Sequence, residues 1–141
     1  MGTIAVSKHL DARTPKTGKD ARRTDWVEAT LSEFDGVRFL HLDSIWVQGA
    51  MRIRKPDQIE LEYVQRMCAW MLWRDPASLA DGHAVQLGLG AAALTRFCHG
   101  QLKMRTTAVE INPEVIAACR QWFRLPANNA RLTVVNADAA A

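Results

Sequence analysis

The sequence has little that would indicate a stapled, exported or membrane-spanning protein. Its 141 residues include three cysteines, which are far apart and form no Cys-x-x-Cys pair, so neither a disulfide framework nor a zinc site is predicted. No apolar run approaches the ~18 residues that cross a bilayer, and the N-terminus has no apolar signal-peptide segment. We therefore expect a soluble, cytoplasmic protein with no metal site and no membrane partner.

Positive and negative residues nearly balance over the whole sequence, with a net charge of only +3. The excess of positive charge lies in residues 1–24, which carry six lysines and arginines against two aspartates. This segment has no periodic apolar pattern, so we predict a flexible basic tail over 1–24. Because short basic tails are usually solvated termini, no nucleic-acid partner is expected.

Residues 25–55 have the pattern of a small antiparallel β-sheet. Apolar and polar residues alternate over 26–34 and again over 37–42, and Asp35-Gly36 separates the two runs. Both residues tolerate positive φ, so this pair favours a tight hairpin turn. A third strand is predicted over 45–51.

Residues 56–141 change to alternating strand and helix patterns. A helix is predicted from Asp57, as N-cap with Glu60 completing a capping box, to about Trp73. Strands are then predicted over 84–87, 106–110 and 131–136, with helices over 91–99 and from Asn112-Pro113 between them. The order βαβαβ implies parallel strands with right-handed connections, which is half of a doubly wound sheet. Cys98 and Cys119 fall on apolar helix faces and are predicted to be core residues.

A candidate ligand site lies at the carboxyl ends of these strands. Gly88-x-Gly90 follows the first strand, and Glu110 ends the next. Glycines let the backbone turn tightly beside a ligand, and the acid can accept hydrogen bonds from ribose hydroxyls. The loop fits G-x-G-x-x-A, so NAD stays open as a ligand. Asp138, just past the third strand, could bind an adenine amino group, which is typical of S-adenosylmethionine pockets.

Several stretches resemble the spermidine synthase-like family, a branch of the class I S-adenosylmethionine-dependent methyltransferase fold. The stretches that resemble the family's cofactor half are 85–90, 108–116 and 131–138. Those that resemble its N-terminal sheet and the helix after it are Phe39–Asp43, Val47–Met51 and Leu61–Tyr63. The resemblance implies an α/β fold in which a small N-terminal antiparallel β-sheet (25–55) precedes the first half (βαβαβ) of a Rossmann-like, methyltransferase-type sheet (56–141).

The family transfers an aminopropyl group from decarboxylated S-adenosylmethionine to an amine, so the resemblance implies that donor, or S-adenosylmethionine itself, and an amine substrate in a polyamine biosynthesis-type reaction. It places Gly88 and Gly90 at the thioether, Glu110 at the ribose and Asp138 at the adenine. Gln48 and Tyr63 would border the tail or the amine. The implied cofactor-binding residues are Gln48, Gly88, Leu89, Gly90, Glu110, Ile111, Asp138 and Ala139, with Tyr63 as the substrate-binding residue.

The chain departs from the usual family pattern near this site. Val64-Gln65 stands where the family has His-Glu, Ala91-Ala92 where an acid follows the glycines, and Asn112 where it has Asp. The family's acids that deprotonate the amine follow a fourth strand, whereas this sequence ends after the third. We therefore expect an incomplete enzyme, with no catalytic residue identified.

Two other functions stay open at this point. One is the NAD-binding half of a Rossmann protein. The other is a non-catalytic dimerisation module, in which the hairpin sheet and exposed tryptophans form the interface. A homodimer is also implied by the family, whose N-terminal sheet commonly contributes to dimers.

Overall fold

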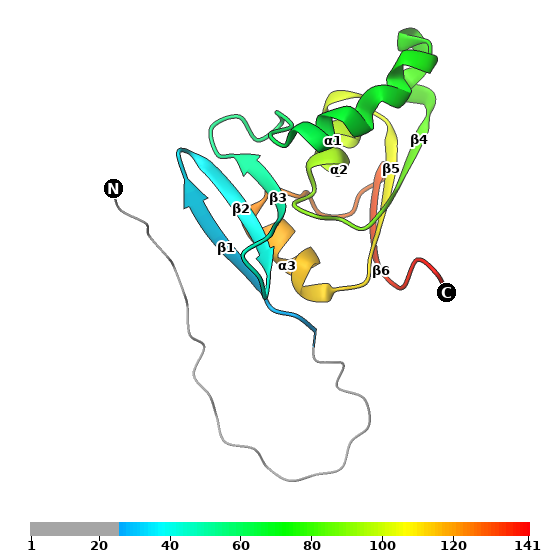
Figure 1. Cartoon of the computed structure of the whole chain (residues 1–141). Coiled ribbons are helices and arrows are strands. Elements are labelled where there is room, and N and C mark those ends of the chain that lie inside the picture. Colours follow the sequence, from blue (N-terminus) through cyan, green and yellow to red (C-terminus); the bar gives the residue numbers. More distant parts are fainter. Residues whose placement is uncertain (1–25) are drawn as a thin grey trace, which may run out of the picture.

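The computed structural model describes residues 26–141, so the basic tail predicted over 1–24 lies outside the described residues. Two three-stranded sheets form the architecture (Figure 1). The antiparallel sheet has the order β1 (Ala29–Phe34), β2 (Val37–Leu42), β3 (Val47–Arg52). The parallel sheet has the order β4 (His83–Leu87), β5 (Arg105–Glu110), β6 (Leu132–Asn136). The predicted α/β class, with a small antiparallel sheet before a parallel one, is confirmed.

The predicted hairpin turn is confirmed in its backbone geometry. Asp35 and Gly36 both have positive φ, at 48° and 72°, which matches the right-handed twist of the flanking strands. Phe34 pairs with Val37 across the turn. The sheet of β1, β2 and β3 is therefore built on a local sequence signal.

The predicted helix from Asp57 to Trp73 starts later and changes character along its length. It consists of α1 (Glu62–Met67), followed by the 3₁₀ helix η1 (Cys68–Trp73). The capping box is wrong, because the Glu60 carboxylate accepts hydrogen bonds from Nε (3.0 Å) and Nη2 (2.7 Å) of Arg52 at the end of β3. A second 3₁₀ helix, η2 (Pro76–Asp81), leads into β4.

The helices between the parallel strands differ in how well the sequence predicts them. The helix predicted over 91–99 lies two residues later, as α2 (Ala93–Arg96) followed by the π-helical η3 (Phe97–Gln101), because Ala91 and Ala92 belong to the preceding turn. α3 (Pro113–Trp122) begins as predicted. The Asn112 side chain accepts a hydrogen bond from Glu114 N (2.9 Å) and donates one to Val27 O (2.9 Å).

One hydrophobic core joins the two sheets, and α3 lies between them (Figure 1). Leu40 and Met51 of the antiparallel sheet are buried in the same cluster as Phe123 after α3 and Ala108 of β5. Arg38 of β2 also donates to the carbonyl of Trp122 (2.5 Å), with its guanidinium 5.6 Å from the centre of that ring. The small sheet is therefore fixed against the parallel sheet.

Cys98 and Cys119 are buried and free, as predicted for core residues, and Cys68 is also buried and free. Within residues 26–141, no helix combines the length and the apolar character needed to cross a membrane. In the same residues, no group of three or more His, Cys, Asp or Glu side chains is arranged to hold a metal ion.

Candidate functional site

The glycine turn after β4 and the acid at the end of β5 meet in the structure. Gly88 and Gly90 have positive φ, at 79° and 53°, so the chain reverses sharply at the carboxyl end of β4. Leu89 N, between them, donates a 2.8 Å hydrogen bond to Oε2 of Glu110. The glycine turn and Glu110, which together predicted a nucleotide site, are therefore in direct contact at the carboxyl ends of β4 and β5.

Backbone amides from both sides orient the Glu110 carboxylate. Besides the bond from Leu89 N, its Oε1 accepts a 2.9 Å bond from Asn112 N. The residue is buried, at 8% exposure. Each carboxylate oxygen can accept more than one hydrogen bond, so the group can still accept hydroxyl donors while the amides hold it. Such a fixed, doubly accepting carboxylate suits the two vicinal hydroxyls of a ribose.

A hollow of about 290 Å³ lies between the glycine turn, β3 and α1. This is near the lower end of the range for small-molecule sites, about 300 Å³. Five of the predicted site residues line it: Gln48, Tyr63, Gly88, Leu89 and Gly90. Tyr63 is 54% exposed, so its phenol lies at the open side of the hollow. The structure thus brings the residues predicted for the thioether and the tail to one cavity.

Gly49 also lines this hollow and was not predicted. A Cβ added at Gly49 would lie 2.5 Å from both N and Cβ of Ala91, so β3 packs directly on the glycine turn. The available signal was a glycine inside a strand pattern, which often marks a close backbone approach.

Gln86 is a second contributor that the sequence did not single out. Its Nε2 lies 3.4 Å from Leu89 O, and its Oε1 accepts a 2.6 Å bond from the buried Thr95 hydroxyl. The side chain therefore links the turn to α2. Only the tertiary structure reveals this, because Gln86 occupies an ordinary position in β4.

Asp138, predicted for the adenine, lies along the same edge of the sheet but does not line the hollow. The predicted cofactor-binding residues Glu110, Ile111 and Ala139 do not line it either. Asn136, at the end of β6, donates 2.9 Å bonds to the carbonyls of Glu110 and Ile111, which places the chain after β6 beside the end of β5. Asp138 accepts a 2.9 Å bond from Ala140 N, in a local turn that includes Ala139. Ile111 is 46% exposed.

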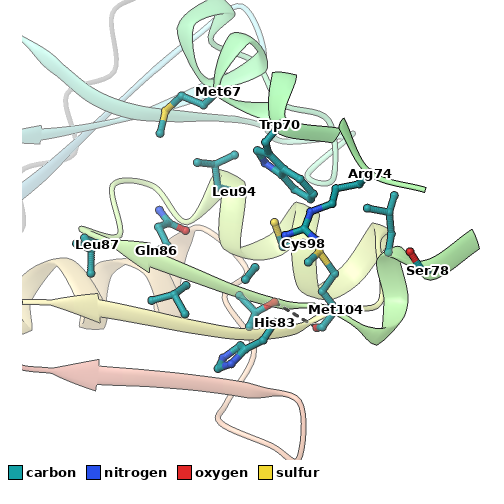
Figure 2. A pocket seen from close by; sticks show the side chains of 15 residues that line it. Met67, Trp70, Arg74, Ser78, His83, Gln86, Leu87, Leu94, Cys98 and Met104 are labelled. Atoms are coloured by element: carbon teal, nitrogen blue, oxygen red, sulfur yellow. Dashed lines mark hydrogen bonds between the residues drawn. The ribbon is translucent and has the colours of Figure 1, made fainter. Parts of the chain in front are cut away.

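A larger cavity, of about 460 Å³, lies beside β4, the edge strand of the parallel sheet (Figure 2). Its lining is mostly apolar, and Figure 2 shows Trp70 of η1 facing Cys98 and Met104 across it. None of the described residues that line it is Asp or Glu. The same is true of the smaller hollow, but that hollow, unlike the larger cavity, is lined by the glycine turn whose Leu89 N binds Glu110. The smaller hollow is therefore the better candidate for a nucleoside site.

Burial keeps the thiols near the turn protonated. It raises the pKa of Cys98 to about 11, with a smaller effect of Cys68 in the same direction. Burial also raises the pKa of Cys119 to about 12, an effect that Arg96 opposes and Glu110 reinforces. Neither thiol has the lowered pKa of a catalytic nucleophile, which agrees with their predicted role as core residues.

These raised thiol pKa values predict a loss of stability in alkali. The folded state binds the Cys119 proton more tightly than the unfolded state, so this stabilisation is complete below pH 9 and is lost as pH rises towards about 12. Urea unfolding should show a fall of about 1 kcal/mol per thiol between pH 9 and pH 10. Cys119→Ala should have a shallower decline than wild type. Parallel declines in the two proteins would contradict the assignment.

The chain matches no protein-family model, whereas individual relatives match most of it. It is 35% identical over 130 residues to a polyamine aminopropyltransferase of Neisseria meningitidis serogroup B, covering 92% of this chain and 48% of that protein. A polyamine aminopropyltransferase of Chromobacterium violaceum is 36% identical over 114 residues, covering 80% of this chain and 42% of that protein. The chain therefore spans about half the length of these curated relatives.

Two solved structures have the same fold over part of their length. A probable spermidine synthase from Corynebacterium glutamicum superposes with a TM-score of 0.68 at 19% identity, covering 89% of this chain and 46% of that one. Human methyltransferase-like protein 13 in complex with SAH gives a TM-score of 0.51 at 31% identity, covering 56% of this chain and 37% of that one. Both likenesses are to longer α/β proteins.

Proposed function

We propose that this chain binds the adenosyl group of the donor in an aminopropyl transfer reaction. The chain is a spermidine synthase-like protein and spans about half the length of its relatives. The observation that carries the proposal is the 2.8 Å hydrogen bond between Leu89 N and Glu110 Oε2. It joins the bare backbone turn that lines the hollow to an oriented, buried carboxylate, although Glu110 itself is not among the residues that line the hollow. A bare turn and a fixed carboxylate are the combination that a ribose-bearing thioether requires.

Each part of the donor has a place in this arrangement. Glu110 would accept hydrogen bonds from the ribose hydroxyls, and Gly88 and Gly90 would let the sulfur approach the backbone. Gln48 and Tyr63, which line the same hollow, would border the aminopropyl tail. We place the adenine near Ile111, Asp138 and Ala139, because Asn136 holds that segment beside the end of β5.

The lining of the hollow favours the decarboxylated donor over S-adenosylmethionine. None of the described residues that line it is Lys or Arg, so no cationic side chain lines the hollow to pair with the carboxylate on the tail of S-adenosylmethionine. The names of the relatives point the same way.

The reaction that follows donor binding needs an amine as acceptor. Its nitrogen would attack the carbon next to the sulfonium and release methylthioadenosine, and a proton acceptor is required for the attack. We assign none of residues 26–141 to that role. The amine acceptor and a homodimeric assembly come from the family resemblance, and the cytoplasmic setting comes from the cysteine pattern and the sequence's lack of an apolar signal segment; all three belong to the proposal.

Calorimetric titration of the 141-residue chain tests donor binding. We expect methylthioadenosine to bind, S-adenosylmethionine to bind more weakly because its tail carboxylate is unpaired, and NADH not to bind. Tighter binding of NADH than of methylthioadenosine would overturn the proposal in favour of a dinucleotide site. A stable oligomer that binds none of the three would favour the dimerisation module instead.

A further inference from the structure

Arg96 of α2 is a buried cation next to the glycine turn, with 5% of its surface exposed. Its Nη1 donates to the carbonyls of Ala91 (2.6 Å) and Phe123 (2.7 Å), and its Nε donates to Pro56 O (3.1 Å). Within residues 26–141, no carboxylate forms an ion pair with it. One guanidinium therefore ties together the turn, the end of α3 and the loop before α1.

Keeping a charge in this place is costly. Burial lowers the pKa of Arg96 to about 10, against the opposing effects of Cys119 and Asp57. An apolar side chain of similar length would fill the same space without the desolvation cost. What a guanidinium adds is a rigid, planar set of donors that can hold several carbonyls at fixed angles. The buried guanidinium therefore fixes the relative positions of the carbonyls of Pro56, Ala91 and Phe123.

One of the three carbonyls bound by the guanidinium, that of Ala91, belongs to a strained part of the turn. Ala92 is fully buried and has a φ of +58°, a left-handed conformation that non-glycine residues adopt only where their surroundings enforce it. Arg96 N donates to Ala92 O (2.9 Å), and Cys119 Sγ donates to Gly90 O (3.1 Å). The carbonyls of Gly90, Ala91 and Ala92 are therefore all held from the helices. Because each peptide unit is planar, fixing its carbonyl also fixes the amide of the next residue.

We infer that Arg96 is a positioning residue for the nucleoside site. Its side chain acts through Ala91 O, keeping the turn in the conformation in which Leu89 N donates to Glu110 and Ala91 packs on Gly49. Arg96 does not line the hollow itself. The identity of the ligand rests on the proposed function, whereas the hold on the turn rests on the contacts of Arg96.

The test compares Arg96→Lys and Arg96→Met in the full chain. Lysine keeps the charge, but its single ammonium cannot reach all three carbonyls, and methionine fills the space without donors. At a temperature where each variant is folded, we expect both to bind methylthioadenosine about tenfold more weakly than wild type, because a displaced turn misplaces the ligand contacts. The ¹H–¹⁵N signals of Leu89, Gly90 and Ala92 should shift in Arg96→Lys without ligand.

Met104→Ala is the matched control, since Met104 is buried and lines the larger cavity instead of the hollow. It should lose stability yet bind within about twofold of wild type and leave the turn signals in place, because distant sites act independently. Wild-type affinity and unshifted turn signals in Arg96→Lys would overturn the inference, as would an equal loss of affinity in Met104→Ala. If wild type binds no methylthioadenosine, the proposed function fails, and the turn signals of Arg96→Lys against Met104→Ala decide the positioning role.

Discussion

Gly49→Ala should separate the small sheet from the glycine turn and lose both stability and ligand binding. The added Cβ would lie 2.5 Å from Ala91 N, which is backbone, so no side chain can rotate to make room. Overpacking of a buried site typically costs 1–3 kcal/mol, and we expect about 3 kcal/mol here because β3 itself must move. Gln48 moves with β3, so the hollow should widen and methylthioadenosine binding should fall. Urea unfolding and calorimetric titration measure the two effects.

Gly100→Ala is the matched control for this substitution. A Cβ at Gly100 would meet no atom within 4 Å, and Gly100 lies in the helical segment η3, so the same chemical change should leave the protein at least as stable as wild type and leave binding intact. A Gly49→Ala protein as stable as Gly100→Ala, and as able to bind, would show that β3 does not pack on the turn.

Glu110→Gln should abolish most of the nucleoside affinity. The carboxylate accepts bonds from Leu89 N and Asn112 N with different oxygens, whereas an amide has only one oxygen and would turn its NH₂ towards the other donor. One buried N–H then lacks an acceptor, which costs about 1–3 kcal/mol of stability. The ribose hydroxyls also lose a charged acceptor, so methylthioadenosine binding should weaken about 100-fold if each charged hydrogen bond is worth at least 1.4 kcal/mol.

Glu114→Gln removes the same charge four residues later, at an exposed position in the first turn of α3. It should leave binding unchanged, because in the described part of the chain the Glu114 carboxylate forms no ion pair and no hydrogen bond with the glycine turn. Glu110→Asp keeps both acceptor oxygens on a shorter stem and should bind with intermediate affinity. Equal affinities in wild type and Glu110→Gln would remove Glu110 from the site.

The fold was predictable wherever a few neighbouring residues determine the geometry. Asp35-Gly36 makes its turn through local φ preferences, and Asn112 caps α3 through its own side chain. The start of α1 was not predictable in this way. Glu60 matches a capping pattern, but Arg52 binds both of its oxygens from the end of β3, and no local rule shows that pairing.

The meeting of the glycine turn and Glu110 was predictable from the sequence, whereas the other contacts of the turn were not. Strand ends of a parallel sheet lie at one edge, so Gly88 and Glu110 could be placed together from spacing alone. Ala91 and Ala92 look like helix residues because alanine has the highest helix propensity, yet tertiary contacts draw them into the turn. The packing of Gly49 on that turn joins residues some forty positions apart, which periodicity does not report.

The packing of β3 on the turn also makes ligand occupancy and the opening of the small sheet thermodynamically linked. If β3 detaches, one wall of the hollow goes with it, so the open form binds poorly and bound ligand must leave first. A ligand at about 100 times its Kd would then oppose that opening by about 2.7 kcal/mol. Amide hydrogens of β3, and those of β2 through its ladder, should exchange with solvent about a hundredfold more slowly. Binding of a molecule at Gly88 and Glu110 would thus slow the amide exchange of β2 and β3, which precede these residues in the chain.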